Sequence, residues 1–118
     1  MARTTIHLMR HGEVHNPEGV LYGRLPGYHL SDLGREMAAQ VADVLSASGH
    51  DVVGVVTSPL ERAVETGAPT AAAFDLRANT DARLTEADNR FEGVPVNRDR
   101  RLLAHPRYWA YYLNPLRP

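Results

Sequence analysis

Residues 52 to 62 read VVGVVTSPLER, and this stretch combines two strong local signals. Its opening part, residues 52–57, is almost continuously β-branched, which is typical of a strand that is covered on both faces in a parallel sheet. The following part, Ser58-Pro59-Leu60-Glu61, matches a capping box, with Ser58 at the N-cap and proline at the first helical position. We therefore predict a buried strand that leads directly into a helix.

A further strand and helix are predicted before this stretch. Residues 4–9 are β-prone and rich in apolar side chains, so we expect a buried strand that ends in the turn Arg10-His11-Gly12. Ser31 can cap a helix that Gly49 is placed to end. The apolar residues of this helix recur at helical spacing: Leu33, Met37, Val41, Val44 and Leu45.

The alternation of strands and helices favours an α/β fold, with a mostly parallel sheet and flanking helices. Gly67 and Pro69 predict a kink or restart in the second helix before residue 73, because proline removes a backbone donor. A short third strand is expected within residues 76–84, whereas residues 86–118 resemble loop, with a short helix near Leu102. No repeat or interdomain linker is apparent, so the chain is expected to lie within one domain.

Composition and charge exclude several classes of function. The 13 Lys plus Arg residues against 14 Asp plus Glu residues argue against a general affinity for nucleic acid or for an anionic membrane surface. The sequence has no cysteine, which excludes disulfides, cysteine-based zinc sites and thiolate catalysis. No stretch approaches membrane-spanning length, so a cytoplasmic soluble protein is the simplest expectation.

The candidate site lies where the predicted strands end. Arg10 and His11 follow the first strand and Arg62 follows the second, and parallel strands end at one edge of a sheet, so these side chains can converge. Arginine binds phosphate oxygens in a bidentate manner, and a helix N-terminus also favours an anion. The positive charges disfavour the imidazolium form, which helps to keep His11 neutral and nucleophilic.

The wider sequence resembles a family signature in the order and spacing of its motifs. The matching stretches are Leu8–Glu13, Asn16, Tyr22–Arg24, Leu30–Gly34, Thr57–Thr66 and Leu84–Glu86. Together, over roughly residues 6 to 93, they resemble the histidine phosphatase family, which is also called phosphoglycerate-mutase-like. The resemblance implies a phosphoglycerate-mutase-like α/β fold, with residues 1–118 as the N-terminal part of a single domain.

The resemblance also assigns roles to residues of this chain. It implies that His11 accepts phosphate, that Arg10 and Arg62 bind it, and that Glu86 protonates the leaving oxygen and then deprotonates the attacking water. Asn16 and the backbone around Gly23 are expected to contact substrate or phosphate. The implied partner is a small phosphorylated substrate, and no metal or organic cofactor is implied.

The chain departs from the family pattern in its local spacing. Family members often place an aromatic residue and asparagine after the RHGE turn, whereas His15-Asn16-Pro17 shifts the asparagine by one position. The Glu92-Gly93 pair also follows Glu86 more closely than in many members.

Other side-chain patterns have simpler interpretations. His7, His11 and His15 recur at a spacing that could hold a metal on a helix, but an extended segment would separate the outer pair by roughly 26 Å, at about 3.3 Å per residue. We therefore predict no metal site. The mixed charges at 98–101 are interpreted as a solvated face, and the aromatic residues at 108–112 as packing residues.

The family site normally includes a second histidine, in a turn after a later strand, and this chain stops before such a segment. His29, His50 and His105 are the remaining candidates. His50 precedes the predicted second strand, so we expect it at the opposite edge of the sheet, roughly 20 Å from Arg62 at about 3.3 Å per residue. In the family topology the missing strand lies between the two predicted strands, so we interpret the chain as truncated at its C-terminus and expect self-association through open strand edges.

The sequence favours phosphomonoester hydrolysis through a phosphohistidine at His11. One alternative is phosphoryl transfer of the phosphoglycerate mutase type, in which the phosphate returns to a substrate. Another is a noncatalytic phosphate-binding or interaction protein that uses the same half-fold. Most of the substrate loops that distinguish a hydrolase from a mutase are weak or absent in this sequence.

Overall fold

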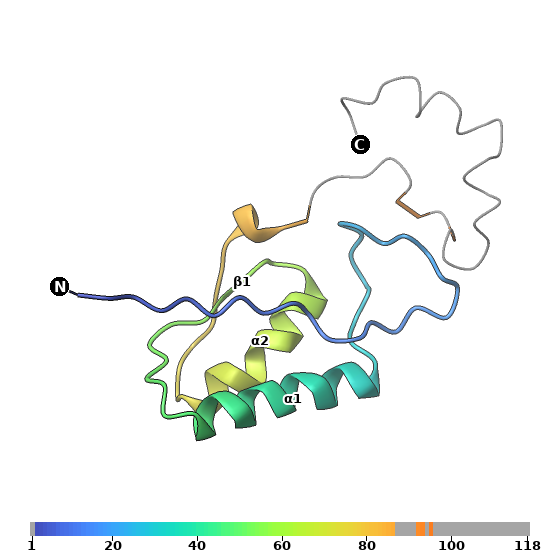
Figure 1. Ribbon diagram of the computed structural model, residues 1–118. Coiled ribbons are helices and arrows are strands. Elements are labelled where there is room, and N and C mark those ends of the chain that lie inside the picture. The colour runs from blue at the N-terminus through green and yellow to red at the C-terminus, as the bar shows by residue number, and fades with distance from the viewer. Residues whose placement is uncertain (1, 87–91, 94, 96–118) are drawn as a thin grey trace.

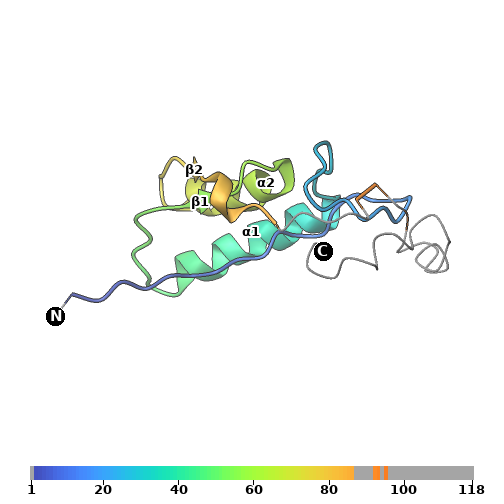
Figure 2. The same cartoon turned by 90° about the horizontal axis from the view of Figure 1, so that it is seen from above.

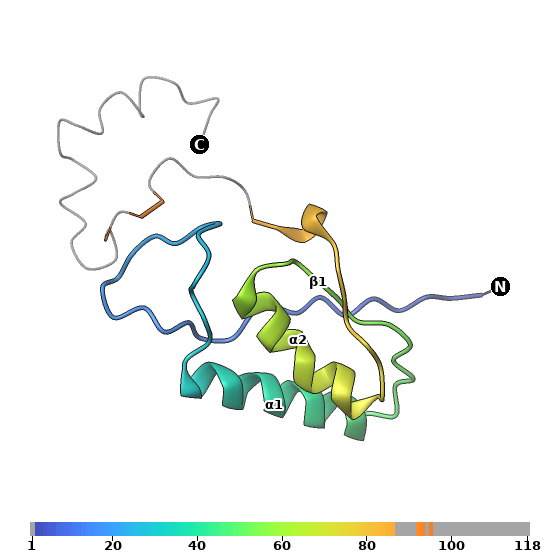
Figure 3. The same ribbon diagram turned by 180° about the vertical axis from the view of Figure 1, so that it is seen from behind.

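The computed structural model describes residues 2–86, 92, 93 and 95 and has an α/β architecture, as predicted (Figure 1). The elements follow in the order α1 (Asp32–Ala47), β1 (Val56–Thr57), α2 (Glu61–Ala73), β2 (Asn79–Thr80) and the 3₁₀ turn η1 (Ala82–Leu84). In Figure 3, α2 lies between α1 and β1, and α2 contacts both of them. No helix in the described part of the chain is long and apolar enough to cross a membrane.

β1 and β2 form a parallel pair, which confirms the predicted sheet direction and the predicted third strand. Val56 lies opposite Asn79, and the two strands form a two-stranded sheet with α2 as the crossover between them. The ladder is held by backbone bonds from Asn79 to Val55 (2.9 Å) and from Asp81 to Thr57 (2.8 Å). The chain leaves β2 through η1 and reaches Glu86 shortly afterwards.

α1 begins and ends where the sequence predicts. The Ser31 hydroxyl caps the helix by accepting the Gly34 N–H at 3.0 Å, and the same hydroxyl donates to the Glu13 carboxylate at 2.8 Å. After the helix, Gly49 adopts a φ of 77°, which favours glycine. The cap therefore also ties the start of α1 to the turn that follows His11.

α1 packs through its small residues rather than through its large apolar ones. Its buried residues are Gly34, Ala38 and Ala42, at a spacing of one helical turn, and α1 contacts α2. The larger apolar residues Leu33, Met37, Val41 and Val44 are all exposed. Small side chains let the two helices approach closely, and they leave the apolar stripe of α1 on the surface.

The start of α2 differs from the predicted capping box. The helix begins at Glu61, its N-cap is Leu60, and no side chain caps it. The Glu61 carboxylate does not reach back to Ser58, because it accepts the backbone N–H of Gly27 at 3.1 Å and also bonds its own N–H. The predicted restart is also wrong, since α2 continues through Pro69 as one helix.

The predicted strand over residues 4–9 is not formed. This segment is extended and exposed, with Ile6 and Leu8 open to solvent, and it pairs with no strand in the part of the chain that the structure describes. In Figures 1 and 2 it runs roughly parallel to the axis of α1, and it does not join β1 and β2. A strand is stabilised by hydrogen bonds to a neighbouring strand, and the 4–9 segment has no such neighbour among the described residues. The second predicted strand is shorter than expected, since β1 covers only Val56–Thr57 instead of 52–57.

Candidate active site

His11 lies in the turn between the extended N-terminal segment and α1, and its ring orientation is fixed by the next residue. The imidazole Nδ1 lies 2.8 Å from the carbonyl oxygen of Gly12. A carbonyl oxygen can only accept, so Nδ1 carries the proton and the neutral ring keeps its lone pair on Nε2. The side chain is 15% exposed and lines a cavity.

Glu86 places a carboxylate close to that nitrogen. Its Oε1 lies 3.7 Å from His11 Nε2, and its side chain is about half exposed. The Arg24 Nε donates to the backbone carbonyl of Glu86, which holds this segment beside the 22–25 loop. The structure therefore brings together the predicted nucleophile and the predicted proton donor.

Arg62 occupies the first turn of α2 and is the largest fully buried side chain in the described residues, at 1% exposed. Its guanidinium donates to the backbone carbonyl of Gly23 and, at 3.4 Å, to that of Leu25. The guanidinium carbon also lies 4.5 Å from the centre of the Tyr22 ring. The Arg62 guanidinium is thus held by the 22–25 loop.

Arg10, His11 and Asn16 line one cavity of about 400 Å³, together with Tyr22. The Tyr22 ring lies 6.2 Å from the His11 ring, between centres, and stacks on Tyr28. Arg62 is not among the residues that line this cavity. The two predicted phosphate ligands are therefore placed differently: Arg10 is exposed at the cavity, whereas Arg62 is buried beneath the loop.

Asn16 and Gly23 both help to set the backbone of the loop between His11 and α1. The Asn16 amide donates to the Val20 carbonyl at 2.8 Å and accepts the Val20 N–H at 3.1 Å. Gly23 has a positive φ of 44°, and a Cβ there would meet the Glu92 side chain.

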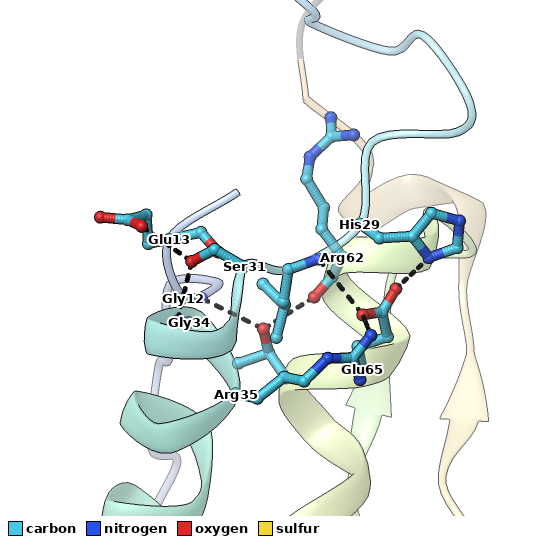
Figure 4. Close-up of polar contacts among 10 residues, drawn as sticks. Gly12, Glu13, His29, Ser31, Gly34, Arg35, Arg62 and Glu65 are labelled. Carbon is cyan, nitrogen blue, oxygen red and sulfur yellow. Dashed lines mark hydrogen bonds and ion pairs between the residues drawn. The ribbon is translucent and has the colours of Figure 1, made fainter. Parts of the chain in front are cut away.

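The turn after His11 packs against both helices, through Gly34 of α1 and Thr66 of α2, which the sequence did not mark as site residues. A Cβ on Gly12 would lie 2.5 Å from the Gly34 carbonyl oxygen, and one on Gly34 would clash with the Glu13 carbonyl. The Thr66 hydroxyl accepts the Gly12 N–H at 3.1 Å. Gly34 and Thr66 both lie inside the motif stretches that resemble the family signature, and this membership was the sequence signal that could have identified them. Figure 4 shows Gly12 beside the first turn of α1.

Three other histidines, His7, His29 and His50, have side-chain partners outside this site. The His50 ring lies against the His7 ring, with centres 4.7 Å apart, and His29 Nδ1 contacts the Glu65 carboxylate. His105 and the residues at 98–101 and 108–112 lie outside the described residues. Within residues 2–86, 92, 93 and 95, no group of three or more His, Asp or Glu residues is arranged to hold a metal ion.

Comparison with known protein families and curated proteins places this site in context. The family model described as the histidine phosphatase superfamily (branch 1) matches residues 6–114. The chain is 51% identical over 115 residues to the uncharacterized protein Rv0525 of Mycobacterium tuberculosis, across 98% of this chain and 56% of that protein. The chain thus spans little more than half the length of this curated relative.

Solved structures show the same fold. A protein described as mycobacterial hydrolase 1 superposes with a TM-score of 0.68 and 28% identity, over 81% of this chain and 43% of that one. A putative alpha-ribazole-5'-P phosphatase of Escherichia coli superposes with a TM-score of 0.68 and 27% identity, over 90% of this chain and 50% of that one. A mycobacterial glucosyl-3-phosphoglycerate phosphatase in complex with inorganic phosphate superposes with a TM-score of 0.66 and 25% identity, over 86% of this chain and 45% of that one.

Proposed function

The chain belongs to the histidine phosphatase superfamily, and on that premise we propose that it supplies the nucleophile and the proton donor of a phosphomonoester hydrolase. The observation that carries the proposal is the pairing of His11 Nε2 with the Glu86 carboxylate at 3.7 Å. The contact from Nδ1 to the Gly12 carbonyl leaves the lone pair on the nitrogen that faces Glu86. The proposed nucleophile and the proposed proton donor therefore lie close enough together to act on one bound phosphoryl group.

The proposed reaction has two steps. In the first, His11 Nε2 attacks phosphorus, the bond from phosphorus to the ester oxygen breaks, and protonated Glu86 gives its proton to the leaving oxygen. In the second, the Glu86 carboxylate takes a proton from water while the water oxygen attacks phosphorus. The phosphorus–nitrogen bond breaks, which releases inorganic phosphate and restores His11.

The cavity at His11 suits a small phosphorylated substrate. Its volume of about 400 Å³ is in the range of small-molecule sites, and the exposed Arg10 at its wall offers a guanidinium to phosphate oxygens. The phosphatases that share the fold include one whose structure holds inorganic phosphate. These observations support a hydrolase with a phosphate monoester substrate. Phosphoryl transfer of the mutase type would use the same His11 intermediate with a substrate hydroxyl in place of water.

The position of Arg62 favours a second candidate, a noncatalytic phosphate-binding or interaction protein. The guanidinium already donates to the Gly23 and Leu25 carbonyls, and it does not line the cavity. Catalysis that uses Arg62 would require the guanidinium to reach the cavity, either with its remaining N–H groups or by exchanging these carbonyls for phosphate oxygens. A chain in which it did neither would bind phosphate through Arg10 without activating it.

Covalent labelling separates the two candidates. The full chain is incubated with a radiolabelled aryl phosphate, and the acid-labile, alkali-stable label is located by mass spectrometry. We expect label on His11 that is lost in His11→Ala and retained in His15→Ala, since His15 is an exposed histidine of the same loop. Undiminished label in His11→Ala would place the nucleophile elsewhere. Saturable phosphate binding without any label would favour the noncatalytic candidate.

A further inference from the structure

Thr66 is a buried side chain of α2 whose hydroxyl joins two parts of the candidate site. It is 5% exposed, and its Oγ1 donates to the Arg62 carbonyl at 2.7 Å and accepts the Gly12 N–H at 3.1 Å. A hydroxyl has a single proton, so the bond to the Arg62 carbonyl directs a lone pair at Gly12. Figure 4 draws these two bonds as dashed lines, one ending at Gly12 and the other at the carbonyl oxygen of Arg62.

Gly12 is held on both sides. Its N–H is bonded to Thr66, and there is no room for a side chain, because a Cβ would lie 2.5 Å from the Gly34 carbonyl oxygen. The carbonyl of the same residue accepts the proton of His11 Nδ1 at 2.8 Å. Any rotation of the Gly12 backbone would therefore move the acceptor that sets the His11 tautomer.

We propose that Thr66 is a positioning residue for His11, acting through Gly12. The hydroxyl fixes the Gly12 backbone, the Gly12 carbonyl fixes the proton on Nδ1, and Nε2 is thereby kept unprotonated and directed towards Glu86. Thr66 does not touch the reacting atoms. The inference rests on the proposed function for the role of His11 as nucleophile, whereas its effect on the imidazole tautomer can be measured without any turnover.

A purely structural role for Thr66 is the competing explanation, and the next turn of α2 supplies a matched control. Thr70 is 3% exposed, and its hydroxyl has no hydrogen-bond partner in the part of the chain that the structure describes. Thr66→Val and Thr70→Val make the same change of shape in the same helix. Only Thr66→Val removes a hydrogen bond to the turn that carries His11. Thr66→Ser keeps the hydroxyl and should restore the behaviour of the parent chain.

The test combines the ring nitrogen signals of isotope-labelled His11, read by NMR, with the rate of covalent labelling by a radiolabelled aryl phosphate. We expect Thr66→Val to shift the neutral ring from the Nδ1–H form to a mixture of tautomers and to slow labelling roughly tenfold, as loss of one preorganised hydrogen bond would. Thr66→Ser and Thr70→Val should keep the parent tautomer and rate.

Unchanged tautomer and rate in Thr66→Val would overturn the proposal, and so would an equal loss in Thr70→Val. If Thr66→Val does not fold, amide exchange in the parent chain decides: the Gly12 N–H should be protected, and exchange at the rate of an open loop would contradict the contact.

The two proposals fail separately. Label retained in His11→Ala refutes the nucleophile and leaves the tautomer effect standing, whereas label lost in His11→Ala with an unaltered tautomer in Thr66→Val refutes only the positioning role.

Discussion

Glu86 Oε1 lies 3.7 Å from His11 Nε2, one side chain coming from the N-terminal turn and the other from the segment after η1. In the proposed mechanism this carboxyl group gives its proton to the oxygen that leaves phosphorus. The contact is the basis of the first prediction, because only some leaving groups need that proton.

Glu86→Gln should slow the hydrolysis of esters with poor leaving groups on the order of a hundredfold, and activated aryl esters much less. The amide keeps the shape but cannot supply the proton. The ratio of the two rates is the measurement, so it remains informative when absolute turnover is low. Glu36→Gln, on the exposed side of α1, is the control and should leave both rates unchanged. Equal losses for both ester types would show that Glu86 has no acid role.

Arg62 should exchange its carbonyl partners when phosphate binds, if it is a phosphate ligand. Adding inorganic phosphate is then expected to shift the NMR signals of Gly23 and Leu25, whose carbonyls now accept from the guanidinium. Chloride at equal ionic strength is the control, because it screens charge without offering oxygens to an arginine fork. Shifts at His11 with none at Gly23 or Leu25 would instead assign Arg62 to the support of the 22–25 loop.

The local elements of this fold were more predictable than the elements that need a distant partner. The cap at Ser31 and the end at Gly49 depend on nearby backbone groups, and both were predicted correctly. The segment 4–9 has the composition of a strand, but composition does not supply a neighbour to pair with. The capping box failed for a related reason, since the Glu61 carboxylate bonds Gly27, a residue far away in the sequence.

The candidate site shows the same limit. The motif resemblance identified His11 and Glu86, which the structure brings together, but it could not show that the 22–25 loop occupies Arg62. Arginine is long and has several donors, so its partners depend on the path of the surrounding backbone. Thr66 was also missed, because a buried threonine in a helix has the same appearance in sequence whether or not its hydroxyl bonds another segment.

The contact between Glu61 and Gly27 should weaken in acid. Hydrogen bonds from its own backbone N–H, and then from that of Gly27, hold the pKa of Glu61 below its ordinary value. Such a group stabilises the fold above its unfolded pKa, and this contribution is lost as the pH falls through the lowered folded value. The Gly27 amide signal should therefore titrate below the ordinary glutamate pKa. Glu61→Gln should abolish that titration, and an identical titration in the variant would assign it to another group.

Gly34→Ala should destabilise the chain although alanine favours a helix. The gain in helix propensity is about 1 kcal/mol, but the new Cβ would clash with the Glu13 carbonyl, and overpacking of this kind costs about 1–3 kcal/mol. The clash should dominate, because backbone atoms cannot move aside as a flexible side chain can. Urea unfolding measures the difference, and Gly54→Ala, where a Cβ meets nothing within 4 Å, is the control. A variant at least as stable as the parent would show that the turn after His11 yields easily.

The chain should self-associate through its exposed apolar segments. Leu8 is 96% exposed, in a segment of strand-like composition that pairs with no strand in the described part of the chain, and Val53, just before β1, is 80% exposed. Unpaired segments of this kind offer backbone donors and acceptors to a second copy, and burial of apolar side chains adds to the attraction.

Leu8→Lys should weaken association because it places a charge where the copies would meet. Burial of one leucine side chain contributes about 1.5–3 kcal/mol, so the dissociation constant should rise roughly ten- to a hundredfold. Little folded stability should be lost, since Leu8 is almost fully exposed in the single chain. Sedimentation over a range of protein concentrations measures the change.

Val44→Lys, on the exposed stripe of α1, tests whether the contact is specific to the N-terminal segment. If α1 forms the contact instead, Val44→Lys will have the larger effect, and a parent chain that remains monomeric at every concentration would show that the exposed segments do not attract one another.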